Sequence, residues 1–321
     1  MLTALISVLV VLLLVVVAIW LVGERGHIVL PSTRRMMGVR PHRDATPPTP
    51  QRQRQRESKF VRVRDAFEGY VYGRWTNQYL SVLIHRIAPQ LGPAGKKWLS
   101  DHYHGKILTH DEARAIITLN TPIKRDLEQI VPYPMARDFI LNASPMVAAY
   151  ECSCRHARPN PCQPTQVCMV VGEAPANFIL EHNPQSSRRL TQNEALELLR
   201  AEHERGHIHS AWFKTALGGR FYAICNCCQC CCGGIEAMKK YSIPMVASSG
   251  YVAAIDSDLC NACGNCAPFC AFDALAVEDS ASRDWEKCMG CGVCVDQCPT
   301  GALSLVRDER KGIPLDVRAM A

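Results

Sequence analysis

The chain has 321 residues, a formal net charge of +6 and eighteen cysteines. Disulfide-dense secreted proteins are usually much shorter, so this cysteine content argues against a disulfide scaffold and favours metal binding. The charge is uneven: residues 23–64 carry eleven Lys and Arg against three acids, whereas residues 250–321 carry six against eleven.

An uncharged apolar segment begins the chain. Residues 2–22, LTALISVLVVLLLVVVAIWLV, would span roughly 32 Å as a helix, about the thickness of a hydrocarbon core. A cleaved signal peptide is the alternative, but no basic n-region or small-residue cleavage site is clear. Lys and Arg follow the segment and none precedes it. We therefore expect a single-pass transmembrane helix (residues 1–23) in the cell membrane, with the bulk of the chain in the reducing cytoplasm.

A basic, proline-rich linker is expected over residues 24–59. Residues 41–57 contain four prolines and a QR repeat, from which no packed core can form. Its arginines favour contact with anionic lipid headgroups beside the anchor. No nucleic-acid-binding fold or interleaved aromatic pattern accompanies them, so we expect no nucleic-acid partner.

Residues 60–150 lack cysteine, and we expect a mainly helical region. Thr109 and Glu112 form a capping-box pattern that predicts a helix through about Leu119. A further helix is predicted from about residue 134 to residue 142.

Residues 151–245 form a second cysteine-rich region. Within it, Thr191 and Glu194 repeat the capping-box pattern, and Gly206 is a plausible end for the helix that follows. The segment RFYAI before Cys225 is typical of a strand. Two histidine groups are interpreted as surface residues, because no H-E-x-x-H pattern accompanies them: His102 and His104, and His203, His207 and His209.

The strongest motif lies in residues 246–321, where it occurs twice. Cys260-x2-Cys263-x2-Cys266-x3-Cys270 recurs 28 residues later as Cys288-x2-Cys291-x2-Cys294-x3-Cys298-Pro299. A [4Fe–4S] cubane needs four thiolates; the tight loop supplies three, and in this bacterial run the fourth comes from the other repeat. Zinc sites usually separate two C-x2-C knuckles, which fits this spacing less well.

The eight cysteines predict two ligand sets. Cluster 1 would take Cys260, Cys263, Cys266 and Cys298, and cluster 2 would take Cys288, Cys291, Cys294 and Cys270.

These motifs resemble the bacterial two-cluster ferredoxins over about residues 250–306. The resemblance implies an α+β fold of two short hairpins and two short helices, and one-electron transfer. One departure is Ala271, where the family usually has proline. Over about residues 130–306 the chain also resembles bacterial proteins described only as 4Fe–4S binding proteins, which have no agreed activity. The overall expectation is therefore α+β: an N-terminal transmembrane helix, a mainly helical middle region and a C-terminal ferredoxin-like domain.

Ten cysteines remain outside the repeat. They are Cys152, Cys154, Cys162, Cys168, Cys225, Cys227, Cys228, Cys230, Cys231 and Cys232. We expect them to form one separate site, and three alternatives stay open: a third or fourth iron–sulfur cluster, a structural zinc site using four of them, or redox-active or unliganded thiols. Gly233 and Gly234 would permit a tight turn. Arg155 and His156 could hydrogen-bond cluster sulfides or lower thiol pKa values.

The leading hypothesis is a membrane-anchored iron–sulfur protein that transfers single electrons through two [4Fe–4S] clusters. Its expected partners are a redox protein that donates or accepts electrons, the membrane itself, and a membrane oxidoreductase complex. The alternative is a reductase whose central cysteines hold a catalytic cluster or dithiol fed by the ferredoxin domain. We identify no catalytic residue.

Overall fold

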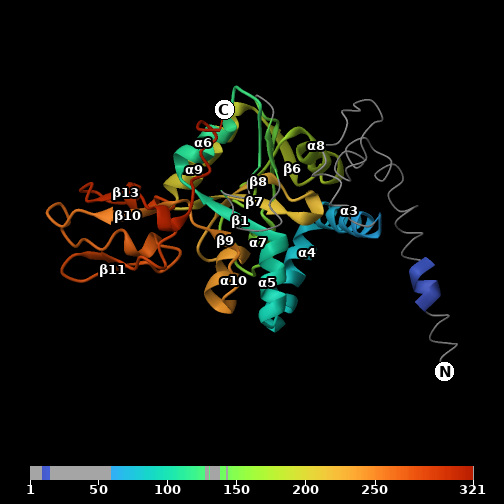
Figure 1. The fold of residues 1–321 in the computed structure, drawn as a ribbon, viewed down its shortest axis with the longest axis horizontal. Helices are drawn as coiled ribbons and strands as arrows, with labels where there is room; N and C mark the ends of the chain where they lie inside the picture. Colours follow the sequence, from blue (N-terminus) through green and yellow to red (C-terminus); the bar gives the residue numbers. More distant parts are fainter. Residues whose placement is uncertain (1–8, 15–58, 127–129, 131–137, 142–143, 321) are drawn as a thin grey trace.

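The computed structural model describes residues 9–14, 59–126, 130, 138–141 and 144–320 (Figure 1). No helix in these ranges is long and apolar enough to cross a membrane. Residues 9–14 are helical; the rest of the predicted anchor, and linker residues 24–58, lie outside the described residues.

A seven-stranded sheet forms the centre of the fold, with strand order β6-β4-β5-β8-β7-β1-β9. Neighbouring strands are antiparallel except β1 and β9, which are parallel. The strands are β1 (Tyr103–Leu108), β4 (Val147–Tyr150), β5 (Cys168–Val171), β6 (Ser187–Leu190), β7 (Ile208–Lys214), β8 (Arg220–Cys227) and β9 (Val246–Ala247). β1 and β4 come from residues 60–150, β5 to β8 come from residues 151–245, and β9 follows. The fold is therefore mixed α+β, as expected. Residues 60–150 do contain more helix than strand, but the sequence did not predict the sheet to which they contribute.

The segment RFYAI, predicted as a strand, lies in β8, but burial on both faces hid other strands from sequence analysis. Every residue of β1, β4, β5 and β7 is buried, even the lysine at position 106. A strand covered on both faces loses the alternation of apolar and polar residues by which strands are recognised. The short sequence YHGKIL of β1 also contains a glycine and three polar residues, so its strand character is not visible locally.

Helices cover the two faces of the sheet (Figure 1). One face packs against α6 (His110–Ile117) and α9 (Gln192–Glu204), where Ile116 and Leu199 meet Phe213 of β7. The opposite face packs against α3 (Lys59–Arg74), α4 (Thr76–Val82), η2 (Leu83–Ile87), η3 (Ala88–Gln90), α5 (Pro93–His102), α8 (Glu173–His182) and α10 (Gly233–Tyr241). The side chains of each strand therefore divide between two separate cores.

Both predicted capping boxes are confirmed. The Thr109 and Thr191 hydroxyls accept from the backbone N–H of Glu112 and Glu194, and each glutamate accepts from the threonine N–H in return. Helix α6 ends at Ile117, two residues before the predicted end. Gly206 follows α9 with φ +78°, as expected of a residue that terminates a helix.

The helix predicted over residues 134–142 was wrong where the structure describes it. Residues Asp138–Leu141 form strand β3, which pairs antiparallel with β2 (Ile123–Asp126). Pairing with a second strand, a non-local contact, decides the conformation here over local helix propensity. The remaining residues of the predicted helix lie outside the described part of the chain.

The cysteine repeat forms a small α+β unit at one end of the sheet, drawn in orange to red in Figure 1. Strand β10 (Tyr251–Ile255) pairs antiparallel with β13 (Leu303–Arg307), and β11 (Leu275–Val277) with β12 (Ala281–Arg283). Two short helical segments, η5 (Ala267–Phe269) and α11 (Val293–Asp296), follow the two cysteine loops, and η6 (Glu309–Lys311) follows β13. The two short helical segments and the hairpin of β11 and β12 agree with the fold that the ferredoxin resemblance implied, whereas β10 and β13 are distant in sequence and form no hairpin.

The repeat provides a matched pair of glycine substitutions. A Cβ on Gly290 would lie 2.1 Å from the Tyr251 carbonyl oxygen, a backbone atom, whereas a Cβ on Gly264 would meet no atom within 4 Å. Both glycines have positive φ, +64° and +77°. We expect Gly290→Ala to destabilise the protein by about 1–3 kcal/mol through overpacking, in addition to about 1 kcal/mol of backbone strain that Gly264→Ala shares.

Chemical denaturation followed by far-UV circular dichroism measures this difference. Equal midpoints for the two variants would contradict the packing of the second cysteine loop on Tyr251.

Candidate metal centres

The eight repeat cysteines line two separate cavities. One is lined by Cys260, Cys263, Cys266 and Cys298, the first ferredoxin set. The other is lined by Cys270, Cys288, Cys291 and Cys294, the second ferredoxin set. In each cavity the distal cysteine of one repeat joins the three clustered cysteines of the other, as the crossed assignment predicts. Cluster ligation by these thiols stays a prediction.

The thiols of each set also act on one another electrostatically. Burial raises the pKa of Cys291 to about 12, and the charges of Cys270 and Cys288 add to the shift. Burial likewise raises the pKa of Cys266, followed by the charges of Cys298 and Cys263. Repulsion between thiolates this close is relieved when a cationic metal centre binds them, so each set favours metal in its cavity.

The ten central cysteines divide into two groups, where the sequence predicted one site. The outer cysteine group comprises Cys162, Cys228, Cys230 and Cys231. The inner cysteine group comprises Cys152, Cys154, Cys168, Cys225, Cys227 and Cys232, all of which line one cavity. The segment CNCCQCCC therefore contributes three cysteines to each group.

The outer cysteine group has the compactness of a mononuclear metal site. Its four Sγ atoms lie within 4.8 Å of one another, and the Sγ atoms of Cys162 and Cys230 are 2.8 Å apart. Four thiolates around one zinc ion stand about 3.8 Å apart. The terminal thiolates of a cubane stand farther apart, about 6 Å, because four irons lie between them. The geometry fits a single tetrahedral ion better than a cubane.

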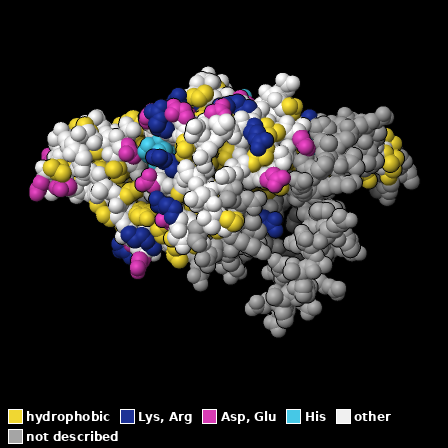
Figure 2. All heavy atoms as spheres, turned by 90° about the horizontal axis from the view of Figure 1, so that it is seen from above, with side chains coloured by type: hydrophobic (Ala, Val, Ile, Leu, Met, Phe, Trp, Pro, Cys, Tyr) yellow, Lys and Arg dark blue, Asp and Glu magenta, His cyan; other side chains and the backbone are white. Residues whose placement is uncertain are grey.

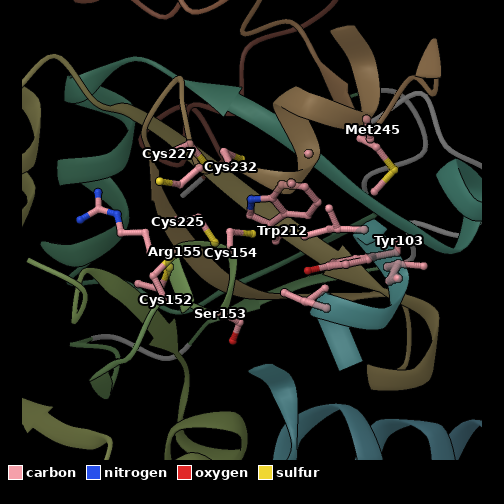
Figure 3. Close-up of a pocket in the computed structure, with 18 of the residues that line it drawn as sticks. Tyr103, Cys152, Ser153, Cys154, Arg155, Trp212, Cys225, Cys227, Cys232 and Met245 are labelled. Atoms are coloured by element: carbon pink, nitrogen blue, oxygen red, sulfur yellow. The ribbon is translucent and has the colours of Figure 1, made fainter. Parts of the chain in front are cut away.

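The inner cysteine group lies on one face of the sheet (Figure 3). Cys168 belongs to β5, and Cys225 and Cys227 alternate with Asn226 on β8, so all three point to the same side. Cys152 and Cys154 follow β4 at the start of α7 (Ser153–His156), and Cys232 is the N-cap of α10. The sheet and two helix ends thus bring six thiols from distant parts of the chain together.

These six thiols line a cavity of ≈ 60 Å³ together with Cys228 and Cys231 of the outer cysteine group, and the rest of its wall is mainly apolar. A hydrogen bond with Cys154 raises the pKa of Cys152 to about 12, and the thiol of Cys168 is also held well above its usual pKa, first by its hydrogen bond with Cys152. Soft thiolates favour iron–sulfur clusters, zinc or Cu(I), and metal binding would displace these protons. Four ligands suffice for a cubane or for one zinc ion, so this cavity has more ligands than either needs.

Gly233 and Gly234 serve close packing, and the expected unusual turn is absent. Neither residue has positive φ; they begin α10. A Cβ on Gly233 would lie 2.4 Å from Cδ1 of Ile84, and one on Gly234 would lie 2.8 Å from the Trp212 ring. The glycines let α10 approach the cavity wall closely enough for Cys232 to join the inner cysteine group.

Arg155 lies between the cysteines and α9, fully buried. Its guanidinium donates to the Glu202 carboxylate at 2.9 Å and to the Asn226 carbonyl oxygen at 3.4 Å. Burial would raise the pKa of Glu202, but the hydrogen bond with His207 and the charge of Arg155 outweigh it and hold that pKa below its usual value. The charge of Arg155 also lowers the pKa of Cys228, although burial keeps it raised to about 12. His156 instead pairs with Glu151 at 2.9 Å on the surface.

Sequence analysis misjudged two histidines and missed a tyrosine network. His104 and His209, interpreted as surface residues, are each 1% exposed. The Tyr72 hydroxyl lies 2.6 Å from that of Tyr222 and 3.2 Å from that of Tyr103, behind the cavity of the inner cysteine group. Tyrosines separated by up to 150 positions in sequence give no local motif that could reveal this contact.

Comparison with protein-family models matches residues 281–304 to a 4Fe-4S binding domain. The matched segment contains the second cysteine motif and Pro299. A 4Fe–4S binding domain therefore lies near the C-terminus and implies iron–sulfur electron transfer; the presence of two clusters stays a prediction. No curated protein matches the sequence.

The buried Arg155–Glu202 pair yields a stability prediction. Glu202→Gln removes the counter-charge of a fully buried guanidinium, and we expect a loss of about 3 kcal/mol. Glu204→Gln, on the same helix, breaks an exposed pair with Arg200 and should leave stability unchanged. Denaturation midpoints of the two variants, measured at pH 7, test this. A Glu202→Gln chain as stable as Glu204→Gln would contradict the role of the ion pair.

Proposed function

We propose that this protein is a membrane-anchored carrier of single electrons. Two [4Fe–4S] clusters, bound by the first and second ferredoxin sets, would pass electrons to or from the inner cysteine group. The observation that carries the proposal is the pair of cavities, each lined by four cysteines from both repeats. The 4Fe-4S binding domain over residues 281–304 supports the chemistry.

The order of the centres follows from packing. Cys270 and Cys291 of the second ferredoxin set contact the same apolar core as Cys227 and Cys232 of the inner cysteine group. No cysteine of the first ferredoxin set contacts that core among the described residues. Cluster 2 would therefore lie between cluster 1 and the inner cysteine group, and electrons would pass in that order.

The first ferredoxin set lies on the side of the molecule that a soluble partner could reach. Cys263 is exposed, and so are four acids of the surrounding loops: Asp256, Asp258, Glu278 and Asp279. Acidic side chains gather at the far tip of this part of the molecule (Figure 2, left). A redox protein with a basic surface would be steered toward cluster 1 by this charge.

The membrane anchor in this proposal is supported by the amino-acid sequence. An uncharged segment over residues 2–22, followed by a basic linker, supports a single-pass protein whose bulk faces the cytoplasm. Such an arrangement would hold the clusters near a membrane oxidoreductase complex, which would be the second redox partner.

The inner cysteine group would hold a further iron–sulfur cluster and the outer cysteine group one tetrahedral ion, zinc or iron. Six thiols close to cluster 2 support the first assignment, and the 4.8 Å compactness of four thiols supports the second. The thiolates of the outer cysteine group would tie the loop around Cys162 to the segment before α10.

One observation favours the reductase alternative. Tyr103 lines the cavity of the inner cysteine group and hydrogen-bonds through Tyr72 to Tyr222. Burial raises the pKa of all three hydroxyls, so they stay protonated and could donate hydrogen bonds to a substrate reduced at that site. Reduction of a small molecule or disulfide would need this binding, the electrons of the clusters and a separate source of protons.

Serine substitutions in the two ferredoxin sets test the electron-transfer proposal. Cys263→Ser should remove the EPR signal of cluster 1 and leave that of cluster 2, and Cys291→Ser should do the reverse, because each change removes one of four thiolates from one cavity. The measurement is the EPR spectrum of the reduced full-length chain, purified anaerobically in detergent.

Cys230→Ser serves as the control, since Cys230 belongs to the outer cysteine group and should leave both signals intact. If both signals survive in Cys263→Ser and in Cys291→Ser, the assignment of the two sets is wrong.

A further inference from the structure

Three histidines converge where the sheet meets the ferredoxin-like unit. His110 is the first residue of α6, His203 lies in the last turn of α9, and His209 lies on β7. Each offers one ring nitrogen, and these three nitrogens lie within 4.8 Å of one another. The two capping boxes and Gly206 fix the helix ends that carry His110 and His203. We call these residues the histidine triad.

The hydrogen bond between His209 and Asn226 determines which ring nitrogen of His209 carries the lone pair. Its Nδ1 lies 2.6 Å from Oδ1 of Asn226, whose Nδ2 donates to the Val167 carbonyl oxygen at 2.7 Å. The amide orientation is thus set, Oδ1 can only accept, and Nδ1 of His209 must be the donor. Its Nε2 then carries the lone pair, and without a metal ion it accepts a hydrogen bond from Nδ1 of His110 at 3.1 Å.

The same reasoning applies to His203. Its Nε2 lies 2.7 Å from a carboxylate oxygen of Asp296, in α11 of the ferredoxin-like unit, so Nε2 donates. The opposite nitrogen, Nδ1, is buried and has no hydrogen-bond partner among the described residues. A buried lone pair without a donor is costly unless another group occupies it.

We propose that the histidine triad binds one divalent first-row transition ion, such as Zn²⁺ or Fe²⁺. Imidazole nitrogens around a tetrahedral ion at about 2.05 Å stand about 3.3 Å apart, close to the 3.1 Å between His110 and His209. Metal-bound histidines almost always donate their other N–H to a carboxylate or carbonyl oxygen. Asp296 and Asn226 fill those roles for two of the three residues.

The site is chemically distinct from both central cysteine groups. It lies on the α6 and α9 side of the sheet, whereas the inner cysteine group lies on the opposite face. It contains no thiol, and His110 is only half-buried. Three nitrogen ligands with access to solvent leave a fourth position for water or a small ligand, the pattern of reactive rather than structural zinc sites.

Cobalt binding by the full-length protein, loaded with its iron–sulfur clusters, tests the proposal. The wild-type chain should bind one Co²⁺ whose visible spectrum lacks the charge-transfer bands of cobalt–thiolate sites. His110→Ala and His203→Ala should each weaken this binding by at least about 10-fold, and Asp296→Asn, which alters only the partner of His203, by about 10-fold. His85→Ala, at an exposed histidine outside the triad, should bind like the wild type.

Acid-labile sulfide equal to that of the wild type shows that each variant is folded with its clusters, and Cys230→Ser should retain the thiol-free signal because its residue belongs to the outer cysteine group. The proposal is overturned if the wild-type chain gives no thiol-free cobalt spectrum, or if His110→Ala and His203→Ala leave that spectrum and the affinity unchanged.

Discussion

The alternation of side chains along strand β8 determines what meets on each face of the central sheet. Cys225 and Cys227 point into the cavity of the inner cysteine group, and Asn226 between them points to the opposite side, where it binds His209. The backbone carbonyl oxygen of Asn226 also accepts from the buried Arg155. A shift of one residue in strand register would exchange the two faces and disassemble both sites together. Register is fixed by antiparallel pairing with β7 on one side and β5 on the other.

Packing on this strand joins the ferredoxin-like unit to the rest of the molecule. The second ferredoxin set shares an apolar core with the inner cysteine group, and Asp296 reaches across to His203 on α9. Phe269 contributes a further contact, because it fills the space beside Gly206 that a Cβ would need. The unit is thus held through η5, its second cysteine loop and α11, while the loop around Cys263 remains exposed. This asymmetry between two repeats with the same cysteine spacing gives the proposed electron path its order.

Local sequence patterns predicted the structural features that neighbouring residues determine, such as helix caps. They predicted few features that depend on distant parts of the chain. The capping boxes at Thr109 and Thr191 were correct because a cap is made within four residues. The central sheet was missed because strands such as β1 are buried on both faces and show no alternation. The division of ten cysteines into groups of six and four could not be seen either, since it depends on how β5, β8 and the segments after β4 and β8 come together in space. Gly233 and Gly234 were noticed for the wrong reason: they permit close packing of α10 where a turn was expected.

The central claim is that the inner cysteine group extends the electron path beyond the ferredoxin-like unit. Iron and acid-labile sulfide in the full-length chain, purified anaerobically in detergent, test it most directly. Two cubanes account for about eight irons, and a third would raise the count to about twelve. The account predicts about twelve in the wild-type chain and about eight in a variant with serine at Cys152, Cys154, Cys225 and Cys232, which leaves too few thiols of the inner cysteine group for a cubane, with both ferredoxin signals retained. A count of eight irons in both proteins would contradict it.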